Sequence, residues 1–276
     1  MTWHPVTMTV RKLDFEPANA PHNWMPGNPE FGYRLNGGSL TLPYLEPYLI
    51  RVMRKARAVL EERHPERKDL LRDIDLFNGQ EAQHYQLHRR YNDLLRERYE
   101  GLEALERELA DDFARFLREE TLEWNLGYSA GFETTGMITA ELFFGEAQPG
   151  LVGADPAVRD LWAWHLAEEF EHRCVAFDVF RALGGRYRRR LQLFFHQARH
   201  LDQFGSRAAA LMQAQDEAAG RVAMRPEPDR EGRSLARRMA WASRSRVLFA
   251  LMPWHDPRRH GPLPEASRFL DGLVTV

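Results

Sequence analysis

Apolar residues return every three or four positions along most of this chain. Between Pro65 and Pro149 there is no proline, and the apolar side chains keep this spacing throughout, which is the period of an amphipathic α-helix. The sequence therefore predicts an all-α protein. We expect helices at 44–63, 66–99, 101–145, 156–184, 187–220 and 231–252.

Glycine and proline mark several of the expected helix ends. Gly101 separates two long helices, Asp155 and Pro156 begin another as N-cap and first helical residue, and Gly184 stops it. Proline, glycine and asparagine are frequent before residue 40, which favours irregular structure there. We expect one domain in three parts: an irregular N-terminal arm over 1–40, a four-helix bundle over 41–185, and two additional C-terminal helices within 186–276 packed on the bundle.

Two of these helices carry polar residues in the middle of an otherwise apolar face. Helical spacing aligns Leu70, Ile74, Phe77, Glu81, His84, His88, Tyr91 and Leu95 in one helix, and Leu161, His165, Glu169, His172, Ala176, Val179 and Leu183 in another. Neither face contains Lys or Arg. A buried carboxylate is costly unless a cation or hydrogen bonds accompany it, so metal ions are the natural compensation.

The acidic residues on these faces follow a repeated spacing. Glu81 and His84 form one Glu-x-x-His pair, and Glu169 and His172 form a second, which places each carboxylate beside an imidazole on one helical turn. Glu46 lies 35 residues before Glu81, and Glu133 lies 36 before Glu169. Two related helical hairpins would bring all six residues together, as in bundles that hold two metal ions.

The charges of these candidate ligands fit two divalent cations. The four carboxylates Glu46, Glu81, Glu133 and Glu169 would balance two such ions. Imidazole and carboxylate ligands without a thiolate indicate iron, manganese or zinc, of which iron is our first expectation. Buried polar residues without any metal are the alternative.

Two segments around these ligands resemble a known family. Residues 77–92 (FNGQEAQHYQLHRRYN) and 162–178 (WAWHLAEEFEHRCVAFD) are similar to the bacterial predicted metal-dependent hydrolases, a ferritin-like group. The resemblance implies a ferritin-like four-helix bundle with a metal site.

A second resemblance concerns one histidine. The spacing His165-x-x-x-Glu169-x-x-His172 is similar to that of p-aminobenzoate N-oxygenase and related arylamine oxygenases, which are ferritin-like di-iron enzymes with a third histidine ligand. This resemblance implies that His165 is a seventh ligand.

The sequence also suggests where Glu46 lies in its helix and what three neighbouring polar residues do. Because Pro47 follows Glu46, we expect Glu46 in the first turn of its helix, where the missing N–H is harmless. His88 is interpreted as a core histidine, with an extra ligand or a proton relay as alternatives. Glu168 is either an acceptor that orients His172 or a solvated neighbour. We expect Asp178 to accept an N–H from a ligand histidine across the bundle.

Composition and charge limit the class of protein. The chain has 276 residues, 43% of them hydrophobic and 28% charged, and a formal charge of −2, which is typical of a folded protein and gives no overall attraction to nucleic acid. One cysteine excludes an intrachain disulfide.

With no signal peptide or membrane span apparent, we expect a cytoplasmic protein. Residues 186–276 carry 17 Arg against 9 Asp and Glu, a net charge of +8; an ordinary solvated surface is favoured over membrane contact.

Three functional hypotheses follow from the proposed site. The first is a di-iron oxidase or oxygenase that acts on O2 and a small organic substrate and takes electrons from an external donor. The alternative is a hydrolase whose zinc or manganese ions activate a water molecule. The third is a non-catalytic, ferroxidase-like metal-handling protein. The two extra helices favour a homodimer with a substrate pocket over a storage cage.

Overall fold

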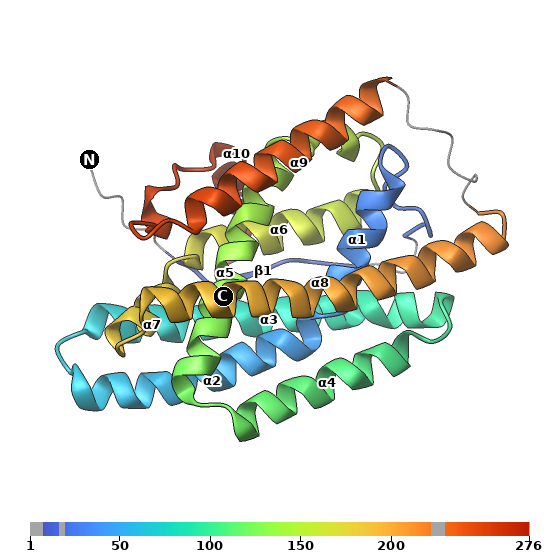
Figure 1. Cartoon of the computed structure of the whole chain (residues 1–276). Coiled ribbons are helices and arrows are strands. Elements are labelled where there is room, and N and C mark those ends of the chain that lie inside the picture. Colours follow the sequence, from blue (N-terminus) through green and yellow to red (C-terminus); the bar gives the residue numbers. More distant parts are fainter. Residues whose placement is uncertain (1–7, 17–19, 222–229, 276) are drawn as a thin grey trace.

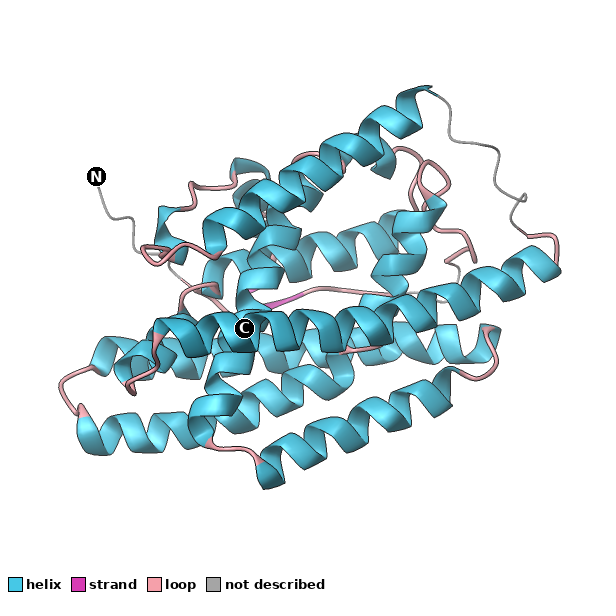
Figure 2. Ribbon diagram, in the orientation of Figure 1, coloured by secondary structure: helices cyan, strands magenta, loops and turns pink. Residues whose placement is uncertain are grey.

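A computed structural model describes residues 8–16, 20–221 and 230–275, and it confirms the all-α class (Figure 2). The described elements, in chain order, are β1 (Arg11–Lys12), α1 (Pro29–Ser39), α2 (Leu42–Arg63), α3 (Lys68–Arg98), α4 (Leu102–Glu119), α5 (Leu122–Phe144), the 3-10 turn Gln148–Leu151, α6 (Pro156–His172), α7 (Val175–Ala182), α8 (Tyr187–Ala218), α9 (Arg230–Ala250), the 3-10 turn Pro257–Arg259, α10 (Pro264–Asp271) and β2 (Val274–Thr275).

Four helices form the bundle that the ligand spacing predicts. The neighbours α2 and α3 pack as one hairpin, α5 and α6 pack as a second, and the two hairpins meet through contacts of α2 with α5 and of α3 with α6 (Figure 1). Most residues of α5 are buried because it also contacts α7, α8 and α9. The bundle core therefore lies between α2, α3, α5 and α6.

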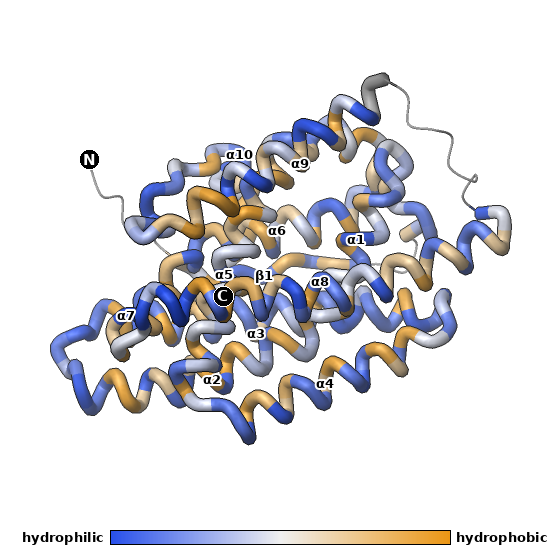
Figure 3. The backbone as a smooth tube through the Cα atoms, viewed as in Figure 1, coloured by the Kyte–Doolittle hydropathy of each residue, from blue (hydrophilic) through white to orange (hydrophobic). Residues whose placement is uncertain are grey.

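The surrounding helices each have one buried and one exposed face. In Figure 3, apolar and polar segments alternate along α4 and α8, as expected for helices at the surface of a folded protein. The helix α8 lies across α5 and contacts α1, and α9 packs on α5. The chain brings Gly37 of α1 against the backbone of Gly205 in α8, where a Cβ at Gly37 would collide with the Gly205 carbonyl.

The sequence prediction of one helix over 101–145 is wrong. The chain leaves the helical conformation at Glu120, whose backbone is extended, and α5 begins after Thr121, whose hydroxyl oxygen accepts a hydrogen bond from the Trp124 N–H at 3.1 Å. This N-cap satisfies a backbone donor at the new helix start. As a result α4 is a separate helix that packs on α2 and α8, and only α5 enters the bundle.

The helix expected over 156–184 is interrupted after His172. Arg173 and Cys174 keep right-handed helical backbone angles but separate α6 from α7. The Arg173 guanidinium donates to the carbonyl of Phe170 and, at 3.0 Å, to that of Pro257. A side chain that takes a helix carbonyl in this way competes with the backbone hydrogen bond and interrupts the helix.

The N-terminal arm is more ordered than the sequence predicts. Residues 1–7 and 17–19 lie outside the described part, but the arm contains α1, which Asn28 caps by accepting the Phe31 N–H. Trp24 donates its indole N–H to Asn36 on α1 at 2.9 Å. The strand β1 pairs antiparallel with β2 near the other end of the chain, Arg11 opposite Thr275.

The C-terminal helices carry several exposed apolar side chains. Trp241 and Leu248 on α9 are 74% and 60% exposed, and Trp254 beyond that helix is 59% exposed. Among the described residues, none of the helices combines the length and the apolar character that crossing a membrane requires.

Candidate metal centre

The structure brings the seven predicted ligands together in the interior of the bundle. All of them are 0–2% exposed. They come from four helices: Glu46 from α2, Glu81 and His84 from α3, Glu133 from α5, and His165, Glu169 and His172 from α6. Glu46 lies in the second turn of α2 rather than the first, because the helix begins at Leu42.

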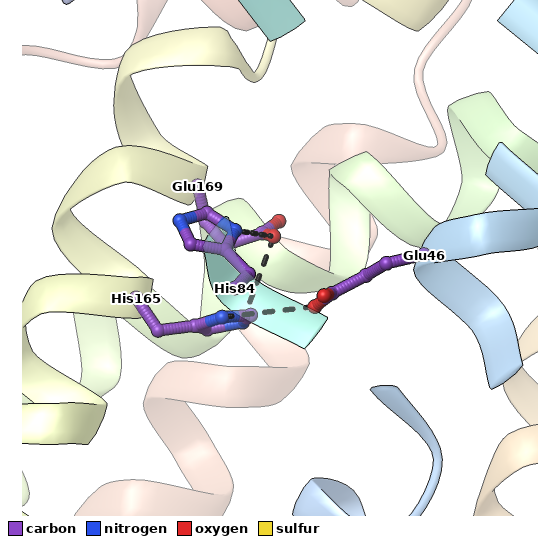
Figure 4. Close-up of side chains that lie close together, drawn as sticks. All are labelled: Glu46, His84, His165 and Glu169. Atoms are coloured by element: carbon purple, nitrogen blue, oxygen red, sulfur yellow. Dashed lines mark ion pairs between the residues drawn. The ribbon is translucent and has the colours of Figure 1, made fainter. Parts of the chain in front are cut away.

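Four of these residues form a first group that could hold a metal ion. One ligand atom from each of Glu46, His84, His165 and Glu169 lies within 4.8 Å of the others. Figure 4 shows the four side chains pointing toward one another from three helices. His165 stands between the two carboxylates, with Nδ1 3.7 Å from Glu46 Oε1 and Nε2 3.6 Å from Glu169 Oε1.

A second group lies next to the first and shares two of its members. Glu81, His84, Glu169 and His172 also place one ligand atom each within 4.8 Å of the others. His172 Nε2 is 3.5 Å from Glu81 Oε1 and 3.8 Å from Glu169 Oε1. Glu169 and His84 belong to both groups, so they could contribute to holding a metal ion in either one.

Glu133 lies beside these groups but in neither of them. Its Oε2 is 2.8 Å from Nδ1 of His172, and its Oε1 has no hydrogen-bond partner in the described structure. An Nδ1–H donated to Glu133 leaves the Nε2 lone pair of His172 directed at Glu81 and Glu169. The contact therefore suits Glu133 to orienting a histidine that is itself a predicted ligand, while the ligand role of Glu133 also stays a prediction.

Buried polar atoms without partners converge on this centre. Within the described residues, both carboxylate oxygens of Glu46, Glu81 and Glu169 are buried and make no hydrogen bond. The same is true of one ring nitrogen of each histidine: Nδ1 of His84, Nδ1 of His165 and Nε2 of His172. Leaving one buried polar group unpaired costs about 1–3 kcal/mol. Nine such atoms facing one region fit a site that binds cations through these atoms.

Burial also sets the protonation of these groups when no cation balances them. Desolvation raises the pKa of Glu46, Glu81 and Glu133 well above the ordinary value of 4.5, and it raises that of Glu169 to about 8. A cation favours the ionised carboxylates that bind it.

The histidines of the centre shift in the opposite direction. Desolvation lowers the pKa of His84 and His165 well below 6.5 and also lowers that of His172. The neutral imidazole is the form that binds a metal.

Gly136 on α5 makes room for the shared carboxylate. A Cβ at this position would collide with Oε2 of Glu169 and lie 3.3 Å from its carboxyl carbon. The side chain of Glu169 thus occupies space that any larger residue at 136 would fill.

Glu168 contacts a different histidine from the one that the sequence suggests. Its Oε2 is 3.0 Å from Nε2 of His84 on α3, whereas helical spacing points to His172 on its own helix. Glu168 is fully buried, so it is not a solvated neighbour. Its Oε1 accepts from Arg11 at 3.2 Å. Arg11 could not be found from the sequence, because no periodicity connects residue 11 to the bundle.

His88 and Asp178 have partners outside both groups. His88 is buried with Nδ1 2.9 Å from the Ser39 hydroxyl, and Ser39 donates to Asn92 at 2.6 Å, which agrees with a core histidine. Its Nε2 has no partner among the described residues. The expectation that Asp178 accepts an N–H from a ligand histidine is wrong. The Asp178 carboxylate instead accepts hydrogen bonds from Arg258 at both of its oxygens.

The chain matches the model of a protein family. A family model described as "Predicted metal-dependent hydrolase" matches residues 9–261, nearly the whole chain. None of the curated proteins and none of the solved structures matches.

Proposed function

We propose that this chain, which belongs to the family of predicted metal-dependent hydrolases, is an enzyme that binds two metal ions in its bundle core and uses them to hydrolyse a small organic substrate. The observation that carries the proposal is the pair of ligand groups that share Glu169 and His84. Adjacent metal sites with a common carboxylate are a recurrent arrangement for hydrolytic chemistry.

The residues around the ligands would keep the site ready for metal. When bound, such ions polarise a substrate oxygen and lower the pKa of a bound water molecule. Glu133 lies 2.8 Å from Nδ1 of His172, and Glu168 lies 3.0 Å from Nε2 of His84. By accepting an N–H from these nitrogens, the two carboxylates would hold the opposite ring nitrogens toward the ions. Apolar packing excludes bulk water, which strengthens these contacts.

The ligand atoms of the centre limit which metal ions it can bind. Oxygen and imidazole nitrogen ligands without sulfur suit iron, manganese and zinc. The single cysteine, Cys174, lies outside both groups, and desolvation raises the pKa of its thiol to about 11, which disfavours the metal-binding thiolate. For hydrolysis we expect zinc or manganese, whereas iron, the first expectation from the sequence, fits the oxidative candidate below.

Oxidation of a small organic substrate by O2 is the second candidate function. It is favoured by the ligand set itself, which combines carboxylates with three imidazoles in a helical bundle and leaves the ligands no more than 2% exposed. The spacing of His165, Glu169 and His172 is similar to that of the arylamine oxygenases. This function would need iron and an external electron donor.

A reconstitution experiment separates the two candidates. The metal-free protein would be loaded separately with Zn²⁺, Mn²⁺ or Fe²⁺ without O2 and assayed on p-nitrophenyl esters and phosphates. Hydrolysis by the Zn²⁺ or Mn²⁺ form supports the first candidate. O2 consumption that requires Fe²⁺, with no anaerobic hydrolysis, supports the second.

Matched variants connect either activity to the site. Glu169→Gln removes the shared carboxylate and is expected to abolish the activity, whereas Glu62→Gln changes an exposed glutamate on α2 and is expected to have no effect. Uptake of many more irons than two per chain, without turnover of any substrate, would instead support a metal-handling protein.

A further inference from the structure

Arg11 connects the N-terminal arm to the metal centre. Its side chain is largely buried although it comes from the two-residue strand β1. The guanidinium donates to both oxygens of Glu171, at 2.8 and 3.0 Å, and to Glu168 Oε1 at 3.2 Å. Two carboxylates of α6 thus converge on one cation.

Glu168 lies between Arg11 and the predicted ligand His84 and contacts both. While Oε1 accepts from Arg11, Oε2 lies 3.0 Å from Nε2 of His84. An N–H donated from Nε2 leaves the lone pair on Nδ1. Nδ1 is the unpartnered nitrogen of His84, and it lies 4.0 Å from Oε1 of the shared Glu169.

Independent contacts hold the arm where Arg11 can reach Glu168. The pairing of β1 with β2 places Arg11 opposite Thr275. Gln80 of α3 donates to the Thr9 carbonyl at 3.1 Å and to Glu171 at 2.9 Å. At Gly79 a Cβ would lie only 2.8 Å from Val10 Cγ2, so the glycine lets the arm lie close against α3.

We propose that Arg11 is a positioning residue of the metal centre: it holds Glu168 so that His84 keeps its hydrogen on Nε2 and presents Nδ1 to the metals. The paired ends of the chain are then part of the site, because β2 fixes the strand that supplies Arg11. This inference rests on the proposed metal centre and not on the reaction that the centre catalyses.

The test measures Co²⁺ binding and the Co²⁺ absorption spectrum in the full-length chain. Loss of a residue that orients a ligand histidine typically weakens metal binding about 10–100-fold, and we expect Arg11→Gln to fall in this range with an altered spectrum. Arg57→Gln removes an arginine from an exposed pair with Asp75 and is expected to leave both measurements unchanged.

A double variant distinguishes positioning from simple anchoring of the arm. If Arg11 acts through Glu168, the variant with both Arg11→Gln and Glu168→Gln should bind Co²⁺ no more weakly than Glu168→Gln alone. The proposal is overturned if the double variant binds Co²⁺ more weakly than either single variant, with the two decreases in affinity multiplied. It is also overturned if Arg11→Gln unfolds at a lower temperature but binds Co²⁺ like the wild type, because Arg11 then only anchors the arm.

Two further results bear on the role of Arg11. If Arg11→Gln does not fold, Glu168→Gln alone tests the same contact, and wild-type Co²⁺ binding and spectrum in that variant would overturn the proposal. A wild-type chain that binds no Co²⁺ would overturn the metal centre together with this role, whereas absence of hydrolysis in a chain that binds Co²⁺ would overturn only the proposed reaction.

Discussion

At the scale of single residues, Glu169 occupies the central position. It belongs to both ligand groups, whereas Glu46 belongs only to the first and Glu81 only to the second. All three carboxylates are fully buried and make no hydrogen bond among the described residues. Their removal should therefore affect metal binding in different ways.

Variants at these three positions should differ in metal content. With about two ions per chain in the wild type, Glu46→Gln and Glu81→Gln should each retain about one, and Glu169→Gln should lose nearly all. Elemental analysis of loaded and desalted protein measures this. Equal metal content in all three variants would contradict the division into two groups.

Gly136→Ala tests the space that the shared carboxylate occupies. The added methyl group would collide with Glu169 Oε2, so we expect weaker metal binding in a protein that remains helical. Gly38→Ala is the matched control, because its Cβ would meet only Trp162 at an ordinary distance of 3.5 Å. Metal titration and circular dichroism of both variants make the comparison.

The ligands predicted from the sequence are those that spacing along the chain determines, either within one helix or, for Glu46 and Glu133, by the repeated separation of 35 and 36 residues. Glu81 with His84, and Glu169 with His172, follow directly from spacing along single helices. The partner of Glu168 does not, since His84 lies 84 positions away on another helix. Arg11 was missed for the same reason, because only the folded chain places it beside α6.

At the scale of elements, interruptions in the long helices determine which segments enter the bundle. Thr121 separates α4 from α5, and the turn at Arg173 separates α6 from α7 immediately after the last predicted ligand. The sequence predicted helical structure in both regions but not these breaks. Apolar periodicity continues across them, and the contacts responsible involve one short cap and one arginine that reaches Pro257.

Thr121→Ala should destabilise the start of α5. Loss of a threonine N-cap costs about 1 kcal/mol, which corresponds to a decrease in melting temperature of about 2–4 °C for a chain of this size. Thermal unfolding measures the change, and Thr121→Ser, which keeps the hydroxyl, should melt like the wild type. Since Thr121 lies far along α5 from Glu133, metal content should not change.

At the scale of the whole molecule, the fold places many ionisable groups in a water-poor core. Desolvation raises the pKa of Glu168 to about 7 and that of Glu169 to about 8, and it lowers the pKa of His84, His165 and His172 below 6.5. Without metal the centre is therefore most stable in its neutral form. Metal reverses this preference by favouring ionised carboxylates.

The stability of the metal-free protein should fall as pH rises from about 6.5 to 8. In this range the buried carboxyls of the folded chain still hold protons that the unfolded chain has released, so raising the pH favours unfolding. The buried histidines oppose this trend only below about pH 6.5, where the unfolded chain protonates them and the folded chain keeps them neutral. Thermal unfolding with a chelator should show this decrease, and saturating Mn²⁺ should remove it. A melting temperature that rises over the same range without metal would contradict the charge assignment.

The most direct test of the central claim is an anomalous difference map from a crystal of the Mn²⁺-loaded chain. We expect two peaks about 3.5–4 Å apart, one between Glu46 and His165 and the other between Glu81 and His172, with Glu169 near both. A map without peaks among these side chains, or with one ion outside the bundle, would contradict it.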